Sequence, residues 1–179
     1  SEIDASNDGT WLDFVRGSIY FIKKLSPTLK GIDIAVSSTI PNGSGLSSSA
    51  ALEISLLRAF SQLQSLAIVP KEMAKIGQQI EHQFVGAQCG IMDQMVSACG
   101  VSGQGIFLDC ESLQTKSLPL FPNHAFIVIH SGSTRKLSQG SYNDRKHETR
   151  VASKILNVPS LRYASLGQIK LIENPTIRR

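Results

Sequence analysis

The chain has 179 residues, of which 41% are hydrophobic and 18% charged, and its formal net charge is +4. This composition excludes a disordered protein and is enough for one ordinary hydrophobic core. No run of residues approaches the roughly 18 consecutive apolar positions of a membrane-spanning helix, and the first residues have neither the basic flank nor the apolar core of a signal peptide. We therefore expect a cytoplasmic protein that does not contact a membrane.

The positive charge is spread along the chain and points to a small anionic ligand. Acidic residues interrupt the lysines and arginines, and aromatic residues do not alternate with them, which disfavours a nucleic-acid partner. The three cysteines, Cys89, Cys99 and Cys110, have neither the even number of a disulfide framework nor the spacing of a zinc site. We expect reduced, partly buried thiols.

In the first half of the chain, apolar spacing predicts helices and one strand. Steps of three and four residues predict an amphipathic helix over 10–25, and the alternation of Ile32, Ile34 and Val36 predicts a strand over 30–39. A glycine and serine loop then leads into a long helix that ends near Gln64. Further helices are predicted from Pro70 to about Val85 and from Asp93 to Cys99.

The second half mixes strands with one more helix. We predict a strand over 103–110, a proline-punctuated connection over 118–126, and a buried central strand in the continuous apolar run 125–131. A basic helix follows over 140–156, with Asn157 and Pro159 as its stop signals. The elements do not alternate regularly, which favours an α+β fold. The chain begins directly on a helix and ends on an unfinished element, so we expect it to be part of a longer polypeptide.

The stretch "PNGSGLSSSAALE", residues 41–53, combines flexible backbone with the start of a helix. Gly43 and Gly45 permit a tight turn, and the amides at a helix N-terminus attract phosphate. Hydroxyl groups there either cap the helix or bind Mg²⁺. The alternative is a plain turn with a serine cap, although one cap needs only one of the serines at 47–49. No lysine follows the glycines, so this is not a Walker A motif.

A second stretch, residues 80–100, carries two carboxylates in apolar company. Asp93 lies among Ile91, Met92 and Met95, and burying such a group unpaired costs several kcal/mol, so it is often kept for chemistry. The alternatives are an N-cap role for Asp93 and a solvated helix position for Glu81.

Three other positions have mainly structural interpretations. We expect His82 at the surface and His130 as a core or edge residue. In the basic stretch 130–150, Tyr142 belongs either to a ligand-facing loop that follows a strand or to a solvated helix.

Together, in this order, these stretches resemble the galactokinase branch of the GHMP family of small-molecule kinases. "PNGSGLSSSAALE" is similar to the ATP-binding motif of that family, "GAQCGIMDQM" to the signature around the catalytic aspartate, and "SGSTRKLSQGSYNDRKHE" to the stretch that supplies a sugar-contacting tyrosine. The resemblance covers nearly the whole chain up to about residue 156.

The resemblance implies a role for particular residues. Asp93 would be the catalytic carboxylate at the anomeric hydroxyl of the sugar, where it would also contact the substrate, and Gly90 and Tyr142 would bind the sugar. Mg²⁺ would be held by Ser48 or Ser49 together with Glu81. The ATP-binding loop would comprise Pro41, Gly43, Ser44, Gly45, Leu46, Ser47, Ser48 and Ser49.

It also implies the fold and the reaction. The family fold is a two-domain α+β architecture with an N-terminal domain of the ribosomal protein S5 domain 2-like type. Residues 1–125 would form most of that ATP-binding domain, truncated at its start, and 126–179 the beginning of the C-terminal domain. The expected activity is ATP- and Mg²⁺-dependent phosphorylation of galactose to galactose 1-phosphate in galactose metabolism.

The alternatives are a kinase for another sugar, such as arabinose or N-acetylgalactosamine, and a non-catalytic regulatory relative that binds sugar and ATP. The first and third family motifs do not occur in these residues, and Ser141 and His130 replace a usual Glu and Asn. We therefore expect the chain alone to be weakly active or inactive, with its preferred sugar and oligomeric state left open.

Overall fold

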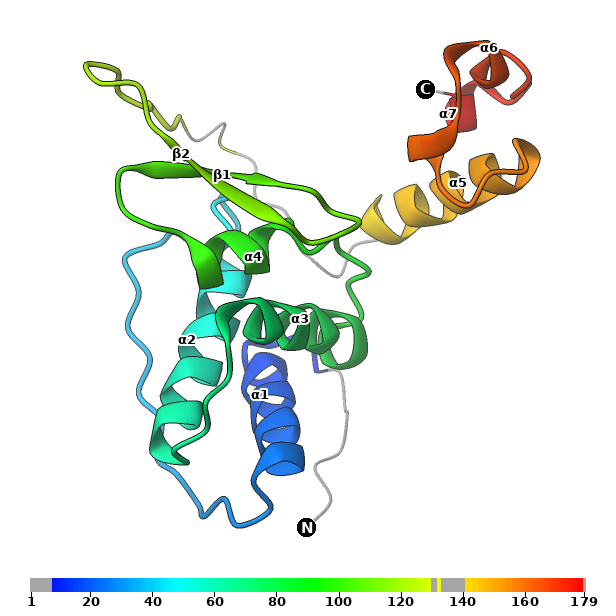
Figure 1. Cartoon of the computed structure of the whole chain (residues 1–179). Helices are drawn as coiled ribbons and strands as arrows, with labels where there is room; N and C mark the ends of the chain where they lie inside the picture. Colours follow the sequence, from blue (N-terminus) through cyan, green and yellow to red (C-terminus); the bar gives the residue numbers. More distant parts are fainter. Residues whose placement is uncertain (1–7, 130–131, 133–140, 179) are drawn as a thin grey trace. The chain divides into compact units, whose positions relative to one another are not determined.

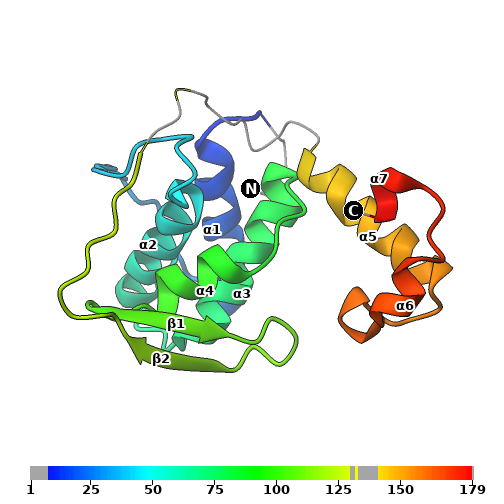
Figure 2. The same ribbon diagram turned by 90° about the horizontal axis from the view of Figure 1, so that it is seen from above.

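The computed structural model describes residues 8–129, 132 and 141–178 and divides the chain into two compact units, residues 1–138 and 139–179. Figures 1 and 2 show two views of the helices and the β-hairpin of the first unit and of the helices of the second.

Helices form most of the first unit. In chain order they are α1 (Leu12–Leu25), α2 (Ser48–Leu63), α3 (Pro70–Ile80), the π-helical turn η1 (Glu81–Val85) and α4 (Met92–Cys99). These bounds confirm the helices predicted from apolar spacing. Pro70 occupies the first turn of α3, where its missing amide proton costs nothing, and Gly100 follows the last residue of α4.

The core of the first unit lies where α1, α2, α3 and η1 pack together (Figure 1). Glycine at position 17 allows α1 to approach the end of α3 and η1 closely, because a Cβ there would lie 2.6 Å from Cγ2 of Ile80 and 3.1 Å from Cδ2 of Phe84. The large side chains of this core include Phe14, Ile22, Leu57, Phe60, Ile80 and Phe84.

A β-hairpin follows α4. Strands β1 (Gln104–Leu108) and β2 (Thr115–Pro119) are antiparallel, with Gln104 opposite Pro119 and Leu108 opposite Thr115. The hairpin meets the helices through Leu108, which packs on a small cluster formed by α3 and α4. The strand predicted over 103–110 is thus confirmed as β1, but residues 118–119 belong to β2 and not to the predicted connection. Every residue of β2 is exposed, so no apolar alternation marked this strand in the sequence.

The strand predicted over 30–39 is wrong, because these residues form no ladder with any described segment. The alternation on which the prediction depended is nevertheless visible in the packing. Ile32 and Ile34 lie against the core, whereas Val36 is 48% exposed. Backbone hydrogen bonds of a strand come from a second segment, and periodicity in one segment cannot supply that partner.

The buried central strand predicted over 125–131 is also wrong within the described part of that run, residues 125–129. These residues are unpaired, and Phe126, Ile127, Val128 and Ile129 are 79, 83, 66 and 85% exposed. Residues 130 and 131 lie outside the described residues. A continuous apolar run fits a central strand only if neighbouring strands cover it, and the described residues provide none.

The second unit is helical in its described part. Its elements are α5 (Ser141–Ile155), the 3₁₀ turn η2 (Leu161–Tyr163), α6 (Leu166–Ile169) and α7 (Pro175–Arg178). A small core joins α5 to the later elements through Ala152, Leu156 and Ile172. The predicted basic helix and its stop are confirmed, since Asn157 has a left-handed backbone with φ of 53° just after α5.

The described residues therefore combine helices with a small sheet, as the α+β prediction requires at that coarse level. Cys89 and Cys99 are partly buried free thiols, as expected, whereas the Cys110 thiol is exposed and that part of the expectation is wrong. Within the described ranges, no helix has the length and apolar character needed to cross a bilayer.

Candidate functional site

The glycine and serine loop turns sharply before α2. Gly43, Gly45 and Ser47 have positive φ angles of 68°, 76° and 56°, a conformation that glycine adopts without strain. The Ser44 hydroxyl donates a hydrogen bond to the carbonyl oxygen of Pro41 at 2.7 Å and closes the turn. A Cβ at position 45 would meet no atom within 4 Å, so a ligand has room to approach this backbone.

No serine side chain caps α2. Ser47 is the N-cap residue, yet its hydroxyl makes no capping hydrogen bond, so the serine-cap alternative is wrong. The first amides of an α-helix have no partner within the helix, and the helix dipole is positive at this end. With Ser48 and Ser49 half-buried beside these amides, the end of the loop can bind an anionic group.

Glu81 lies at the junction of α3 and η1 and is only 2% exposed, so the alternative of a solvated helix position is wrong. Its Oε2 has no hydrogen-bond partner among the described residues, and burial raises the pKa of its carboxyl group. Short π-helical segments within helices occur frequently at functional sites. A buried carboxylate oxygen without a partner is unfavourable, and a bound cation would relieve that cost.

Three of the predicted residues come together where α2, η1 and α4 meet. The Ser49 hydroxyl hydrogen-bonds to the Glu81 carboxylate and opposes the rise in its pKa, whereas the charge of Asp93 raises that pKa further. Asp93 is half-buried in the first turn of α4. The N-cap of that helix is Ile91, so the predicted N-cap alternative for Asp93 is wrong.

Beside this group lies a second, fully buried pair. Glu53 of α2 is 0% exposed and Gln94 of α4 is 1% exposed. The Gln94 Nε2 donates a hydrogen bond of 3.3 Å to Glu53 Oε2. Burial first, and then the charge of Glu81, raises the pKa of Glu53 well above its ordinary range, while the Gln94 hydrogen bond lowers it. Burial and the nearby carboxylates also raise the pKa of the Cys89 thiol to about 12, so this thiol is unreactive.

The remaining predicted residues are placed as follows. Gly90 is exposed between η1 and α4, where a Cβ would meet no atom within 4 Å. His82 is half-buried with Nε2 3.0 Å from the carbonyl oxygen of Cys89, rather than on the open surface as predicted. The backbone of Tyr142 is in the first turn of α5, in the second unit, but its side chain and all of His130 lie outside the described part.

Comparison with known proteins gives the relationships of this chain. Residues 13–101 match the model of the GHMP kinases N terminal domain. Over 170 residues, which are 94% of the chain, the sequence is 39% identical to a galactokinase of Pasteurella multocida (strain Pm70). This chain is a homologue of galactokinases, and its residues 13–101 resemble the N-terminal domain of GHMP kinases. A galactokinase of Mannheimia succiniciproducens is 38% identical over 169 residues.

A solved structure extends this relationship to the fold. The crystal structure of Lactococcus lactis galactokinase complexed with galactose matches 99% of this chain and 48% of that protein, with a TM-score of 0.80 and 27% identity. The chain spans 44% of the length of the Pasteurella and the Mannheimia galactokinases. The part matched by the family model, residues 13–101, contains the candidate loop, Glu81 and Asp93 but not Tyr142.

Reasoning from the sequence missed the buried pair of this galactokinase homologue. Glu53 follows Ser49 by four residues and lies between Ala50 and Leu57 on the apolar face of its helix. A carboxylate within an apolar stripe was the signal that could have identified it. Gln94 had no comparable signal, because a glutamine after Asp93 is ordinary in a helix.

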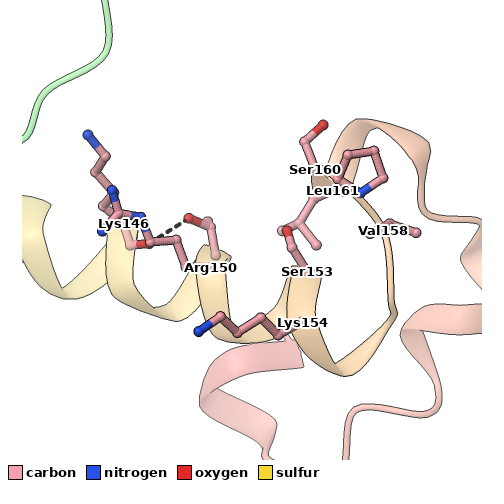
Figure 3. Close-up of a pocket in the computed structure, with 9 residues that line it drawn as sticks. Lys146, Arg150, Ser153, Lys154, Val158, Ser160 and Leu161 are labelled. Carbon is pink, nitrogen blue, oxygen red and sulfur yellow. Dashed lines mark hydrogen bonds between the residues drawn. The ribbon is translucent and has the colours of Figure 1, made fainter.

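A separate pocket lies on the second unit of the galactokinase homologue (Figure 3). It has a volume of about 470 Å³ between α5 and the residues that precede η2, and Lys146, Arg150 and Lys154 follow one another at helical spacing along it. The pocket is lined by Lys146, Thr149, Arg150, Ser153, Lys154, Val158, Pro159, Ser160 and Leu161. None of the predicted site residues is among them.

Proposed function

We propose that this chain carries the ATP-binding loop and the catalytic aspartate of a sugar kinase that phosphorylates galactose at its anomeric hydroxyl. The observation that carries the proposal is the meeting of α2, η1 and α4. There the Ser49 hydroxyl contacts a buried Glu81 carboxylate, and the charge of Asp93 acts on the same group. The similarity to galactokinases, one of them complexed with galactose, supports the choice of substrate.

In this proposal, the loop from Pro41 to Ser49 binds the phosphates of ATP. The open space at Gly45 and the uncapped start of α2 support that role, because backbone amides and the helix dipole attract phosphate there. Phosphoryl transfer depends mainly on positioning and on neutralisation of charge, and both are properties of such a loop.

The residues also fit a Mg²⁺ ion. Glu81 Oε2 is buried without a partner among the described residues, and the Ser49 hydroxyl lies beside the same carboxylate. Oxygen ligands of this kind suit Mg²⁺, which usually binds one or two protein groups together with substrate phosphates. No set of three or more His, Cys, Asp or Glu side chains that could hold a metal occurs among the described residues. Bound there with Ser48, Ser49 and Glu81 as ligands, Mg²⁺ would neutralise phosphate charge.

The proposed role of Asp93 is to orient the anomeric hydroxyl and accept its proton or stabilise its charge. Its half-buried position in the first turn of α4 supports this role, since it is both reachable by a sugar and held by a helix. Gly90 would leave room for the sugar, and Tyr142 would contact it.

We further propose that the complete protein has the two-domain, S5-like GHMP architecture in the cytoplasm, with residues 1–125 in the N-terminal domain and 126–179 in the C-terminal one. The compact units, by comparison, divide after residue 138. In this proposal the chain alone has weak or no activity, because it spans less than half of its galactokinase relatives.

A substrate panel tests the proposed reaction. The galactokinase-length polypeptide that contains this chain is incubated with ATP, Mg²⁺ and a set of sugars that includes galactose, arabinose and N-acetylgalactosamine, and the sugar 1-phosphate is measured. We expect galactose to give the highest kcat/KM. A different preferred sugar would correct the substrate, and binding of ATP and galactose without turnover would show a regulatory relative instead. No turnover and no binding would contradict the proposal.

A further inference from the structure

We propose that Glu53 is a positioning residue, which fixes the catalytic aspartate through its hydrogen bond with Gln94. This role rests on the proposed function, since it assumes that Asp93 reacts with the sugar. Glu53 itself is fully buried in α2 and does not reach a substrate, so it would act only through its neighbour in α4.

A buried hydrogen bond connects Glu53 to the residue after Asp93. Gln94 directly follows Asp93, and its amide donates a hydrogen bond of 3.3 Å to Glu53 Oε2. Both side chains of this pair are buried, at 0 and 1% exposure, so water does not compete for the bond. Fixing Gln94 in this way fixes the first turn of α4, and the direction in which Asp93 points depends on that turn.

Helix α2 also holds in register the two carboxylates of the candidate site, Glu81 and Asp93. Ser49 and Glu53 are four residues apart in α2 and therefore lie on one face of it. Ser49 hydrogen-bonds to Glu81 at the start of η1, whereas Glu53 binds Gln94 in α4. One rigid helix thus sets the position of Glu81 and of the residue beside Asp93 at the same time.

Helix α3 leaves the side chains of Glu53 and Gln94 no room to move. Gly77 faces it, and a Cβ at that position would lie 3.0 Å from Cγ of Gln94 and 3.3 Å from Oε2 of Glu53. The same Cβ would be 3.5 Å from Cδ1 of Ile54, so the space is already filled to van der Waals contact. Tight packing of this kind locks side-chain rotamers, which is what a positioning contact needs.

Packing alone does not account for a carboxyl group at position 53. Its Oε1 and the Oε1 of Gln94 have no hydrogen-bond partner among the described residues. An apolar side chain of similar volume would avoid the cost of burying these groups. It would also leave the Gln94 amide with only the weak Cys89 acceptor, whose Sγ lies 3.9 Å from Nε2, and free α4 to shift. The carboxyl group is thus unfavourable for stability and useful for holding α4.

The test compares two substitutions of Glu53 in the galactokinase-length polypeptide. Glu53→Leu removes the acceptor at nearly constant volume, and we expect it to lower kcat by about 10- to 100-fold, the range seen when supporting hydrogen bonds of a site are lost. The Kd for ATP should stay close to that of the wild type, because the loop is untouched. Glu53→Gln keeps an acceptor oxygen for the Gln94 amide, and it should restore most of the wild-type kcat.

The matched control is Leu57→Val, a core substitution one turn further along α2. Leu57 is 0% exposed, and its replacement perturbs packing without touching Gln94. Its kcat should equal that of the wild type. If Glu53→Leu does not fold, Gln94→Leu removes the same bond from the other side and carries the same expectation.

Two results would overturn the role of Glu53. The first is a wild-type kcat in Glu53→Leu or Gln94→Leu, and the second is an equal loss of kcat in Glu53→Leu, Glu53→Gln and Leu57→Val. Both presuppose an active wild type. A wild-type polypeptide that phosphorylates no sugar would contradict the proposed function itself and this role with it.

Discussion

The helices of the first unit bury their large apolar side chains, whereas the extended run 126–129 exposes them. In α1, α2, α3 and η1 the large side chains face one another, and Phe84 is 2% exposed. In the extended run 126–129 they face outward, and Ile127 is 83% exposed. Both regions carry large apolar side chains, but only the helices have a partner to pack against in the described residues.

The difference follows from where each element finds its backbone hydrogen bonds. A helix satisfies its amides within one segment, so an amphipathic sequence such as 12–25 needs only a face to bury. A strand needs a second segment at the right distance and register. In a chain that spans less than half of its galactokinase relatives, the helices can therefore form fully while predicted strands remain unpaired.

The largest expected effect is a loss of turnover in Asp93→Asn, which tests the chemistry of the helical region separately from its stability. In Asp93→Asn the side chain keeps its size, so the helices around it should persist. Sugar phosphorylation by the galactokinase-length polypeptide should fall by about 10²- to 10⁴-fold, the contribution typical of a proton-accepting group. Turnover and the Kd for ATP are measured together, with circular dichroism as the check on folding. Joint loss of structure and turnover would instead give Asp93 a structural role.

The next largest effect concerns stability. Phe84 contacts the rings of Tyr20 and Phe21, with ring centroids 5.3 and 6.4 Å apart, and is nearly inaccessible to solvent. Phe84→Ala should lower the free energy of unfolding by about 3–5 kcal/mol, because it removes buried area and leaves a cavity. Urea unfolding of the 179-residue chain measures this value. A cost near zero would show that the helical core is not packed as described.

A smaller effect comes from pH. Since burial raises the pKa of Glu53, the folded chain binds a proton more tightly than the unfolded one. The free energy of unfolding should therefore fall as pH rises above about 4.3, the ordinary Glu value, by up to about 1.4 kcal/mol per pH unit until the folded pKa is passed. Glu53→Gln should flatten this dependence and be the more stable form at neutral pH.

Urea unfolding of both proteins with a metal chelator, from about pH 5 to 8, measures the two slopes on the alkaline side of the ordinary Glu pKa. Glu81 of η1 also has a raised pKa, so it contributes a slope of the same sign that remains in the variant. Parallel curves for the two proteins would contradict a proton on Glu53 at low pH.

The elements that could be predicted from the sequence are mainly those whose hydrogen-bond partners are local, and the elements that could not are those that depend on distant segments. The helices and the stop at Asn157 were predictable, because spacing and end signals lie within one segment. The run 125–129 was predicted as buried, because apolar character alone cannot tell whether a cover exists. Strand β2 was not predicted as a strand, since it is held by backbone pairing with β1 and has no buried face.

The candidate site was predictable in part for a similar reason. Motif resemblance named Ser49, Glu81 and Asp93, and their convergence is visible once α2, η1 and α4 are packed. That convergence depends on tertiary contacts, as does the burial of Glu81, so chemistry alone favoured a solvated position for it. The buried contact between Glu53 and Gln94 joins residues 41 positions apart, and no spacing in the sequence indicates such a bond.

The smallest expected effect tests the extended region directly. Ile127→Thr replaces a side chain that is 83% exposed, so in the 179-residue chain it should change the free energy of unfolding by no more than about 0.5 kcal/mol. In the galactokinase-length polypeptide the same substitution should cost more, if other segments cover this run there as its apolar sequence predicts. Ile54→Thr, in the buried core of α2, is the matched control and should destabilise both proteins. An equal and negligible cost of Ile127→Thr in both would mean that this apolar run stays exposed, and the prediction of a central strand would then fail for the longer protein too.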